Sequence, residues 1–210
     1  MRKATLLTLL CVIASSVTSF GLTLAGEAEV FLASMEHINS LIDSFDNETG
    51  TGLGPMRAGV GVTLGMPIIA YGDFATLSVG AEGLMARRSS SQTTAIASCI
   101  GVLAEVSMAF GPFRASADAL ICRGSFDFPG ERLVGLSASG VGVRGSLGYT
   151  LQIAGRLVAE LSLGYRHLPF TEMMDGAGHT YRGRGTPFMD FSGITASIGI
   201  EWMVSERSNE

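Results

Sequence analysis

The sequence predicts an all-β fold, an eight-stranded antiparallel up-and-down transmembrane β-barrel. Three observations predict it: segments that alternate between apolar and polar residues, connections that alternate between short and long, and an unusual composition. Glycine contributes 28 of the 210 residues, and charged residues make up 16%, against about 25% in typical soluble domains. Alternation gives a strand one apolar and one polar face, and a barrel wall between lipid and lumen needs both.

The N-terminus has the features of an export signal. Arg2 and Lys3 precede an apolar run over residues 4–14, and the small residues Ser19 and Gly21 suit a signal peptidase. An uncleaved anchor helix is the alternative. Without this segment, 12 basic residues face 19 acidic ones, a net charge of −7 that argues against nucleic-acid binding. We expect three parts: a signal peptide over 1–21, the barrel over 22–204 and a short C-terminal tail over 205–210.

No apolar run beyond the signal reaches the about 18 residues of a transmembrane helix. Alternation with a period of two residues recurs instead. In the second segment, for example, Met56, Val60 and Leu64 alternate with Arg57 and Gly61. We expect strands at residues 22–33, 56–66, 74–86, 95–110, 113–124, 138–151, 156–166 and 194–204.

The connections between these segments alternate in length. Outer-membrane barrels place short turns on the periplasmic side and long loops outside, so the cell outer membrane is the expected location. Apolar spacing over residues 35–45 predicts a short amphipathic helix in the first long loop. The short connections are 67–73, 111–112 and 152–155, and the long ones are 34–55, 87–94, 125–135 and 167–189.

Alternation alone does not say which face points outward, because a soluble lipocalin-like barrel has the opposite sense. The polar face here is rich in glycine, serine and threonine, which suits the narrow lumen of eight strands. We interpret its charges as an ion-pair network that plugs the lumen, and the alternative is a narrow, charge-lined pore. These lumen residues are Glu27, Glu29, Arg57, Glu82, Glu105, Arg114, Asp118, Arg144, Glu160, Arg166 and Glu201.

Aromatic residues collect near the expected membrane boundaries, where girdles of Tyr, Trp and Phe are typical. We also expect Phe170 and Phe188 near the outer boundary, with Phe126 and Phe128 in its loops. The predicted girdle is Tyr71, Phe74, Phe110, Phe113, Tyr149, Tyr165 and Trp202.

With these features the chain resembles the small OmpA/OmpX-type outer-membrane barrels. The final segment, FSGITASIGIEWMV, is similar to the C-terminal signal that the barrel assembly machinery recognises, with Trp202 as its near-terminal aromatic residue. It departs from that pattern because residues 205–210 follow where the family ends in Phe. The resemblance implies architecture, assembly by that machinery and contact with outer-membrane lipid, and we expect no periplasmic domain.

Few residues suggest chemistry. Cys99 and Cys122 fall on neighbouring strands and face inward, so they are either a disulfide or two buried thiols. His167 or His179 could pair with Ser192, Asp175 or Asp190, but no spacing supports catalysis. We therefore expect no enzyme, cofactor or metal site. The expected role is structural or surface contact, with a narrow passive pore or a soluble lipocalin-like ligand carrier as alternatives.

Overall fold

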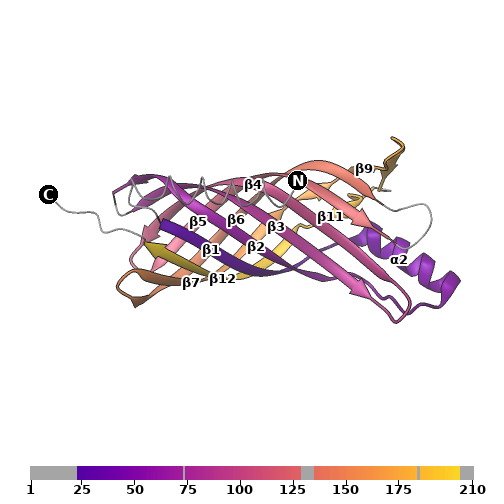
Figure 1. Cartoon of the computed structure of the whole chain (residues 1–210), viewed down its shortest axis with the longest axis horizontal. Helices are drawn as coiled ribbons and strands as arrows, with labels where there is room; N and C mark the ends of the chain where they lie inside the picture. Colours follow the sequence, from indigo (N-terminus) through magenta and orange to yellow (C-terminus); the bar gives the residue numbers. More distant parts are fainter. Residues whose placement is uncertain (1–22, 73, 129–134, 184, 204–210) are drawn as a thin grey trace, which may run out of the picture.

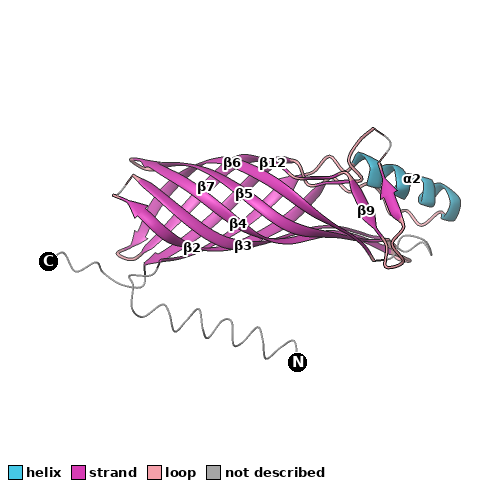
Figure 2. Ribbon diagram, turned by 90° about the horizontal axis from the view of Figure 1, so that it is seen from above, coloured by secondary structure: helices cyan, strands magenta, loops and turns pink. Residues whose placement is uncertain are grey.

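A closed β-barrel dominates the chain. The computed structural model describes residues 23–72, 74–128, 135–183 and 185–203, so the predicted signal peptide and tail lie outside the described residues. Each long strand pairs antiparallel with its neighbours along the chain (Figure 2), and β1 pairs with β12 to close the barrel (Figure 1). The barrel strands are β1 (Thr23–Leu32), β2 (Ala58–Tyr71), β3 (Ala75–Ser89), β4 (Thr94–Phe110), β5 (Phe113–Asp127), β6 (Leu136–Ala154), β7 (Leu157–His167) and β12 (Gly193–Met203).

This architecture confirms the predicted eight-stranded up-and-down barrel. Several strands are longer than predicted. For example, β2 continues through Pro67 to a tight turn at Gly72, whose φ is +59°. Proline has no N–H to donate, and the β2–β3 register accordingly shifts between Pro67 and Ile69. The tight turns at Gly72 and Gly111 lie at one end of the barrel and define the turn end.

The opposite end, which we call the loop end, carries additional structure (Figure 1). The helix α2 (Glu36–Thr49) follows β1, where the sequence predicted a short helix, and buries Ile38 and Ile42. It ends at Gly50, a left-handed residue whose N–H donates to the carbonyl oxygen of Asp46. The short strands there are β8 (Pro169–Phe170), β9 (Glu172–Met174), β10 (Thr180–Arg182) and β11 (Met189–Asp190).

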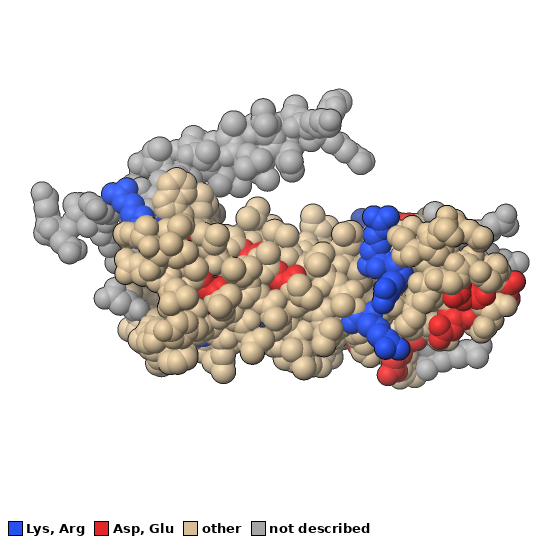
Figure 3. Space-filling model, turned by 90° about the horizontal axis from the view of Figure 1, so that it is seen from below, with Lys and Arg blue, Asp and Glu red and all other residues tan. Residues whose placement is uncertain are grey.

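The outer wall of the barrel is apolar. Ile100 and Leu147 are 70% and 71% exposed, and Figure 3 shows few charged side chains on the middle of the wall. This sense of alternation is that of a transmembrane barrel, and it is opposite to the lipocalin-like alternative. No helix within the described ranges is long and apolar enough to cross a membrane.

The predicted girdle residues lie on the outer wall, all of them exposed. Tyr71 and Phe74 flank one tight turn, Phe110 and Phe113 flank the next, and the ring of Tyr149 packs edge-on against Phe113 at 5.5 Å. Placed beside the tight turns, these rings suit a membrane–water boundary at that end.

Other residues assigned to the outer wall or outer boundary are buried, and those predictions were wrong. Met56 lies under α2, not on the lipid-facing wall, because the chain has not yet entered β2 at that point. The two phenylalanines expected at the outer boundary, Phe170 and Phe188, turn inward because the loops fold over the barrel mouth. Phe126 and Phe128, expected in the loops, are buried beside them, and Phe126 lies within β5.

An arginine in the middle of the outer wall should be costly. Val102 lies at the centre of β4 and is exposed. We expect Val102→Arg to lower the free energy of unfolding by about 2–4 kcal/mol, as for arginine at the bilayer midplane. Urea unfolding from lipid vesicles measures this loss, and Val102→Ala is the uncharged control. Equal stability of the two variants would mean that this wall does not face hydrocarbon.

Candidate functional site

Two arginines bind four carboxylates in the middle of the lumen. Arg144 on β6 donates to Asp118 at 2.7 Å, to Glu29 at 3.0 Å and to Glu27 at 3.1 Å. Arg166 on β7 bridges Glu29 and Glu82. The strand register produces this meeting, because Arg144 lies directly opposite both Asp118 and Arg166. We call these six residues the central ion-pair layer.

The central layer is desolvated, so its charges depend on one another. The side chains of Arg144 and Arg166 are 3% and 2% exposed, and Glu29 is fully buried between them. Buried charges require paired and hydrogen-bonded partners, and the planar guanidinium fork supplies several donors in a fixed geometry. Thr63 adds a hydroxyl to Glu82 at 3.4 Å.

Glycine on the inner wall makes room for this layer. A Cβ at Gly61 would lie 2.7 Å from Cγ of Glu29 and 2.7 Å from a methyl group of Leu84. Real side chains do not approach so closely, so a larger residue at Gly61 would displace Glu29 from its arginines. The small residues of the polar face are therefore part of the ion-pair geometry.

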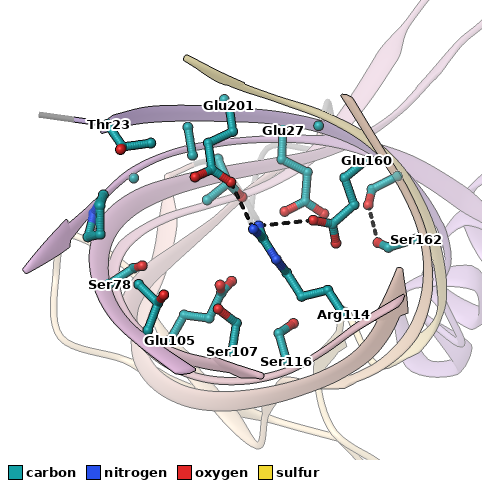
Figure 4. A pocket seen from close by; sticks show the side chains of 18 of the residues that line it. Thr23, Glu27, Ser78, Glu105, Ser107, Arg114, Ser116, Glu160, Ser162 and Glu201 are labelled. Atoms are coloured by element: carbon teal, nitrogen blue, oxygen red, sulfur yellow. Dashed lines mark hydrogen bonds and ion pairs between the residues drawn. The ribbon is translucent and has the colours of Figure 1, made fainter. Parts of the chain in front are cut away.

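The turn-end half of the lumen is an open-mouthed cavity of about 110 Å³, lined by several carboxylates and serines. Arg114 projects across it and binds Glu160 at 3.1 Å and Glu201 at 3.0 Å (Figure 4). Paired serines add cross-strand hydrogen bonds in the wall, at 2.7 Å for Ser116 with Ser146. We call this cavity the vestibule.

An apolar plug fills the loop end of the lumen above the central layer. Phe31, Phe126, Phe170 and Phe191 are all nearly or fully buried there. The ring of Phe31 packs edge-on against Phe191 at 5.6 Å, and the Arg166 guanidinium carbon lies 5.8 Å from the Phe31 ring centre. This cation–π contact joins the plug to the central layer.

Loop residues and α2 complete the plug. Gly140 admits the Phe170 ring, because a Cβ there would lie 2.6 Å from it. Met35, Ile38 and Ile42 pack onto the same cluster from α2 and the turn before it. The lumen is thus stacked as a polar vestibule, an ion-pair layer and an apolar plug.

The structure places most of the predicted lumen residues inside the barrel, with two departures. Glu105 lines the vestibule but makes no ion pair with any described residue. Arg57 does not enter the lumen: it is exposed at the loop end, just before β2, so its assignment to the network was wrong. Its carbonyl accepts the Ala33 N–H at 3.1 Å, which fixes the backbone at the rim.

Of the two alternatives for the cysteines, a disulfide or two thiols, the structure has two buried free thiols. Cys99 lies opposite Gly124, and Cys122 lies opposite Gly101, so the cysteines are diagonal neighbours rather than a directly facing pair. Cys122 approaches the carbonyl oxygen of Gly140 at 3.7 Å. The alternative of two buried thiols describes the structure.

His167 and His179 do contact partners that the sequence suggested. These contacts hold the backbone of the loops in place. The Ser192 hydroxyl lies 3.3 Å from Nδ1 of His167 and also accepts the Leu168 N–H at 2.9 Å. Asp190 accepts the Ser192 N–H at 2.8 Å, and no carboxylate of the described chain is hydrogen-bonded to His167. The described residues also contain no group of side chains that could hold a metal ion.

His179 belongs to a second anchor at the tip of the β9–β10 hairpin. Its Nδ1 lies 2.9 Å from a carboxylate oxygen of Asp175, which also accepts the backbone N–H groups of Ala177 and His179. These hydrogen bonds, above all that with the His179 ring, lower the pKa of Asp175 to about 2. The tip is therefore organised around one ionised carboxylate.

Sequence reasoning missed the plug and the arginines of the rim. Phe31 lies in phase with Glu27 and Glu29, and Phe126 lies in phase with Cys122, so both share the inner face. A large aromatic residue on an otherwise small and polar face was the available signal for a plug. Arg87 and Arg123 also continue the outward phase of Met85 and Ile121, so an arginine on the apolar phase near a strand end was an available signal for basic residues at the rim.

Three comparisons with known proteins were made. No protein-family model matches the chain, and no curated protein matches it. Among solved structures, Neisserial surface protein A is 16% identical with a TM-score of 0.43, covering 88% of this chain and 97% of that one. A major outer-membrane protein from Thermus thermophilus is 9% identical with a TM-score of 0.49, covering 87% and 99%.

The translocator domain of the autotransporter NalP from Neisseria meningitidis is 9% identical, with a TM-score of 0.33 over 96% and 95% of the two chains. The strand order, the closure and the outward apolar face of this chain give it the fold of the small OmpA/OmpX-type barrels.

Removal of one central arginine should be strongly destabilising. We expect Arg166→Met to lower the free energy of unfolding by about 3–5 kcal/mol, because it leaves buried carboxylates of Glu29 and Glu82 without their shared partner. Arg57→Met is the matched control, and we expect a change within about 0.5 kcal/mol at this exposed position. Equal losses in urea unfolding would contradict the description of the central layer.

Strong acid should loosen the β9–β10 tip. Because the pKa of Asp175 in the folded state, about 2, is below its ordinary value, ionised Asp175 stabilises the tip above pH 4, and this is lost as pH falls towards 2. We expect amide protection factors at Ala177 and His179, measured by NMR, to fall across this range. Asp175→Asn should lower these protection factors at pH 5 and remove their pH dependence. If neither acid nor this substitution changes them, ionised Asp175 does not organise the tip.

Proposed function

We propose that this chain is a sealed integral outer-membrane barrel with a structural or surface-contact role. The observation that carries the proposal is the double closure of the lumen, by the central ion-pair layer and by the apolar plug above it. A solute entering the vestibule would meet Arg144 and Arg166, each bound to at least two carboxylates. Beyond them lies a layer of buried aromatic rings.

The outer wall supports the membrane location. Its exposed apolar side chains and paired backbone suit hydrocarbon, in which only helices and closed barrels satisfy every backbone group. The export signal predicted over residues 1–21 is consistent with passage to an outer membrane. Outer-membrane lipid and the barrel assembly machinery are the partners that this location implies.

The loop end supports a role in surface contact because hydrogen bonds fix α2 in one position on it. Asn39 of α2 exchanges two hydrogen bonds with the Met56 backbone, donating to its carbonyl at 2.9 Å and accepting its N–H at 2.7 Å. Asp46 accepts the Thr51 hydroxyl at 2.5 Å and the Leu53 N–H at 3.0 Å. The helix therefore presents an acidic outer face on a fixed base.

A narrow conduit is the second candidate, and the vestibule is what favours it. The cavity is open at the turn end and lined by Glu105, Glu160 and Glu201, so it would admit cations in preference to anions. Conduction would require both the ion-pair layer and the plug to move aside. A sealed barrel requires no such movement.

Planar-bilayer recordings separate the two candidates. We expect the refolded wild-type protein to give no stable conductance steps at moderate voltage, because both layers block the lumen. An open porin in the same bilayer shows that the assay detects channels. Reproducible cation-selective steps from the wild type that lose selectivity in Glu105→Gln would contradict a sealed lumen and establish the conduit.

A further inference from the structure

Two arginines point outward from the barrel wall near the loop end. Arg87 follows Met85 on the same face of β3, and Arg123 follows Ile121 on the same face of β5. Met85 and Ile121 are exposed on the apolar wall, so Arg87 and Arg123 emerge from the wall that faces lipid. In the ladder, Arg123 lies opposite Ile100, another exposed apolar residue.

These two guanidinium groups have only neutral partners within the described chain. Arg87 donates to the Ser89 hydroxyl at 3.1 Å, and Arg123 donates to the Ser137 hydroxyl at 3.1 Å. Four other described arginines have carboxylate partners: Arg114, Arg144 and Arg166 in the lumen, and Arg182 with Glu172 at 2.8 Å. The outward pair thus carries charge that no described acidic group neutralises.

Two more exposed arginines lie at the same rim but in phase with the inner wall. Arg57 precedes β2 in phase with the buried Gly59, and Arg88 follows the buried Ala86 and donates to the carbonyl oxygen of Pro55 at 2.6 Å. Figure 3 shows basic side chains in a band between the apolar wall and the loop structures, with acidic side chains further out. We call Arg87 and Arg123, which emerge from the outer wall, the arginine belt.

The position of the arginine belt, at the edge of the apolar wall, indicates which anions it can contact. A guanidinium is costly in hydrocarbon, so Arg87 and Arg123 must extend to the polar boundary just beyond the apolar wall. The anions at such a boundary are lipid phosphates, and the guanidinium fork matches phosphate oxygens in pairs. We propose that the arginine belt binds the phosphate groups of lipids in the outer leaflet around the barrel.

This inference rests on the proposed membrane location and adds a lipid class to it. The belt anchors the barrel at a fixed depth and holds phosphorylated lipid against its β3–β5 side. Arginine, rather than positive charge alone, is the feature that matters, since lysine lacks the paired donors. A double Lys variant should therefore bind lipid phosphate with intermediate affinity.

Native mass spectrometry of the mature protein in detergent micelles tests the proposal, with dioleoyl phosphatidic acid as the probe. We expect wild type to retain this lipid in preference to dioleoylglycerol, which lacks phosphate. The double variant Arg87→Gln/Arg123→Gln should weaken the apparent Kd about 30-fold, from about 1 kcal/mol for each basic residue near a charged membrane surface. Arg156→Gln, the same change beside the tight turn at the opposite end, should leave the Kd unchanged.

The controls separate the remaining outcomes. A heat-dependent gel shift shows that each variant is a closed barrel, and a wild type that fails to fold in micelles would count against the proposed function itself. Undiminished phosphatidic acid binding by a folded double variant, or an equal loss in Arg156→Gln, would overturn the belt. Displacement of the lipid by millimolar inorganic phosphate would also overturn it, because the site would then take a free anion rather than a lipid.

Discussion

The structure depends on the hydrogen-bonded closure of β1 against β12. In hydrocarbon every strand N–H and C=O needs a partner, and an open sheet would leave two unpaired edges. Residues Thr23–Phe31 pair with Met203–Thr195, and the remaining neighbours are joined by tight turns or loops. Once eight strands close, the interior is too narrow for anything but side chains, and this width constrains every inward-facing position.

The narrow interior restricts the inward face of the barrel wall much more than the outward face. Outward side chains need only be apolar, so Val, Leu and Ile interchange along the wall. Inward side chains must fit and must also satisfy their polar groups, so glycine and serine alternate with charged residues whose partners lie on other strands. Glu29 on β1 shows this, because it is held by arginines from β6 and β7. The central layer therefore joins strands that are distant in sequence and fills space that water would otherwise occupy.

The period-two pattern was sufficient to predict the strands, their order and the inward set of charges, because each follows from alternation and connection length. It was insufficient at the loop end. Met56 and Arg57 continue the alternation of β2 on paper, but β2 begins only at Ala58, so neither takes its predicted face. Phe170 and Phe188 were expected at the membrane boundary because the sequence does not show that the loops fold back into the mouth.

The cysteine pairing failed for a related reason. The turn of a hairpin fixes which residues lie opposite each other. Cys99 and Cys122 are offset diagonally by two residues, and such an offset determines whether two thiols can form a disulfide. The composition of the strands does not show this offset. Alternation assigns Arg87 and Arg123 to the outward face, but their depth relative to the membrane boundary depends on the three-dimensional tilt of the strands, which the sequence does not show.

The central claim is that the chain forms a closed barrel with an apolar exterior. Gel mobility of the membrane-extracted mature protein in detergent, unheated against boiled, tests it most directly, because a closed barrel resists detergent until it is heated. The account predicts a clear heat-dependent shift for protein recovered from the membrane fraction. Recovery in the soluble fraction with no shift on boiling would contradict it.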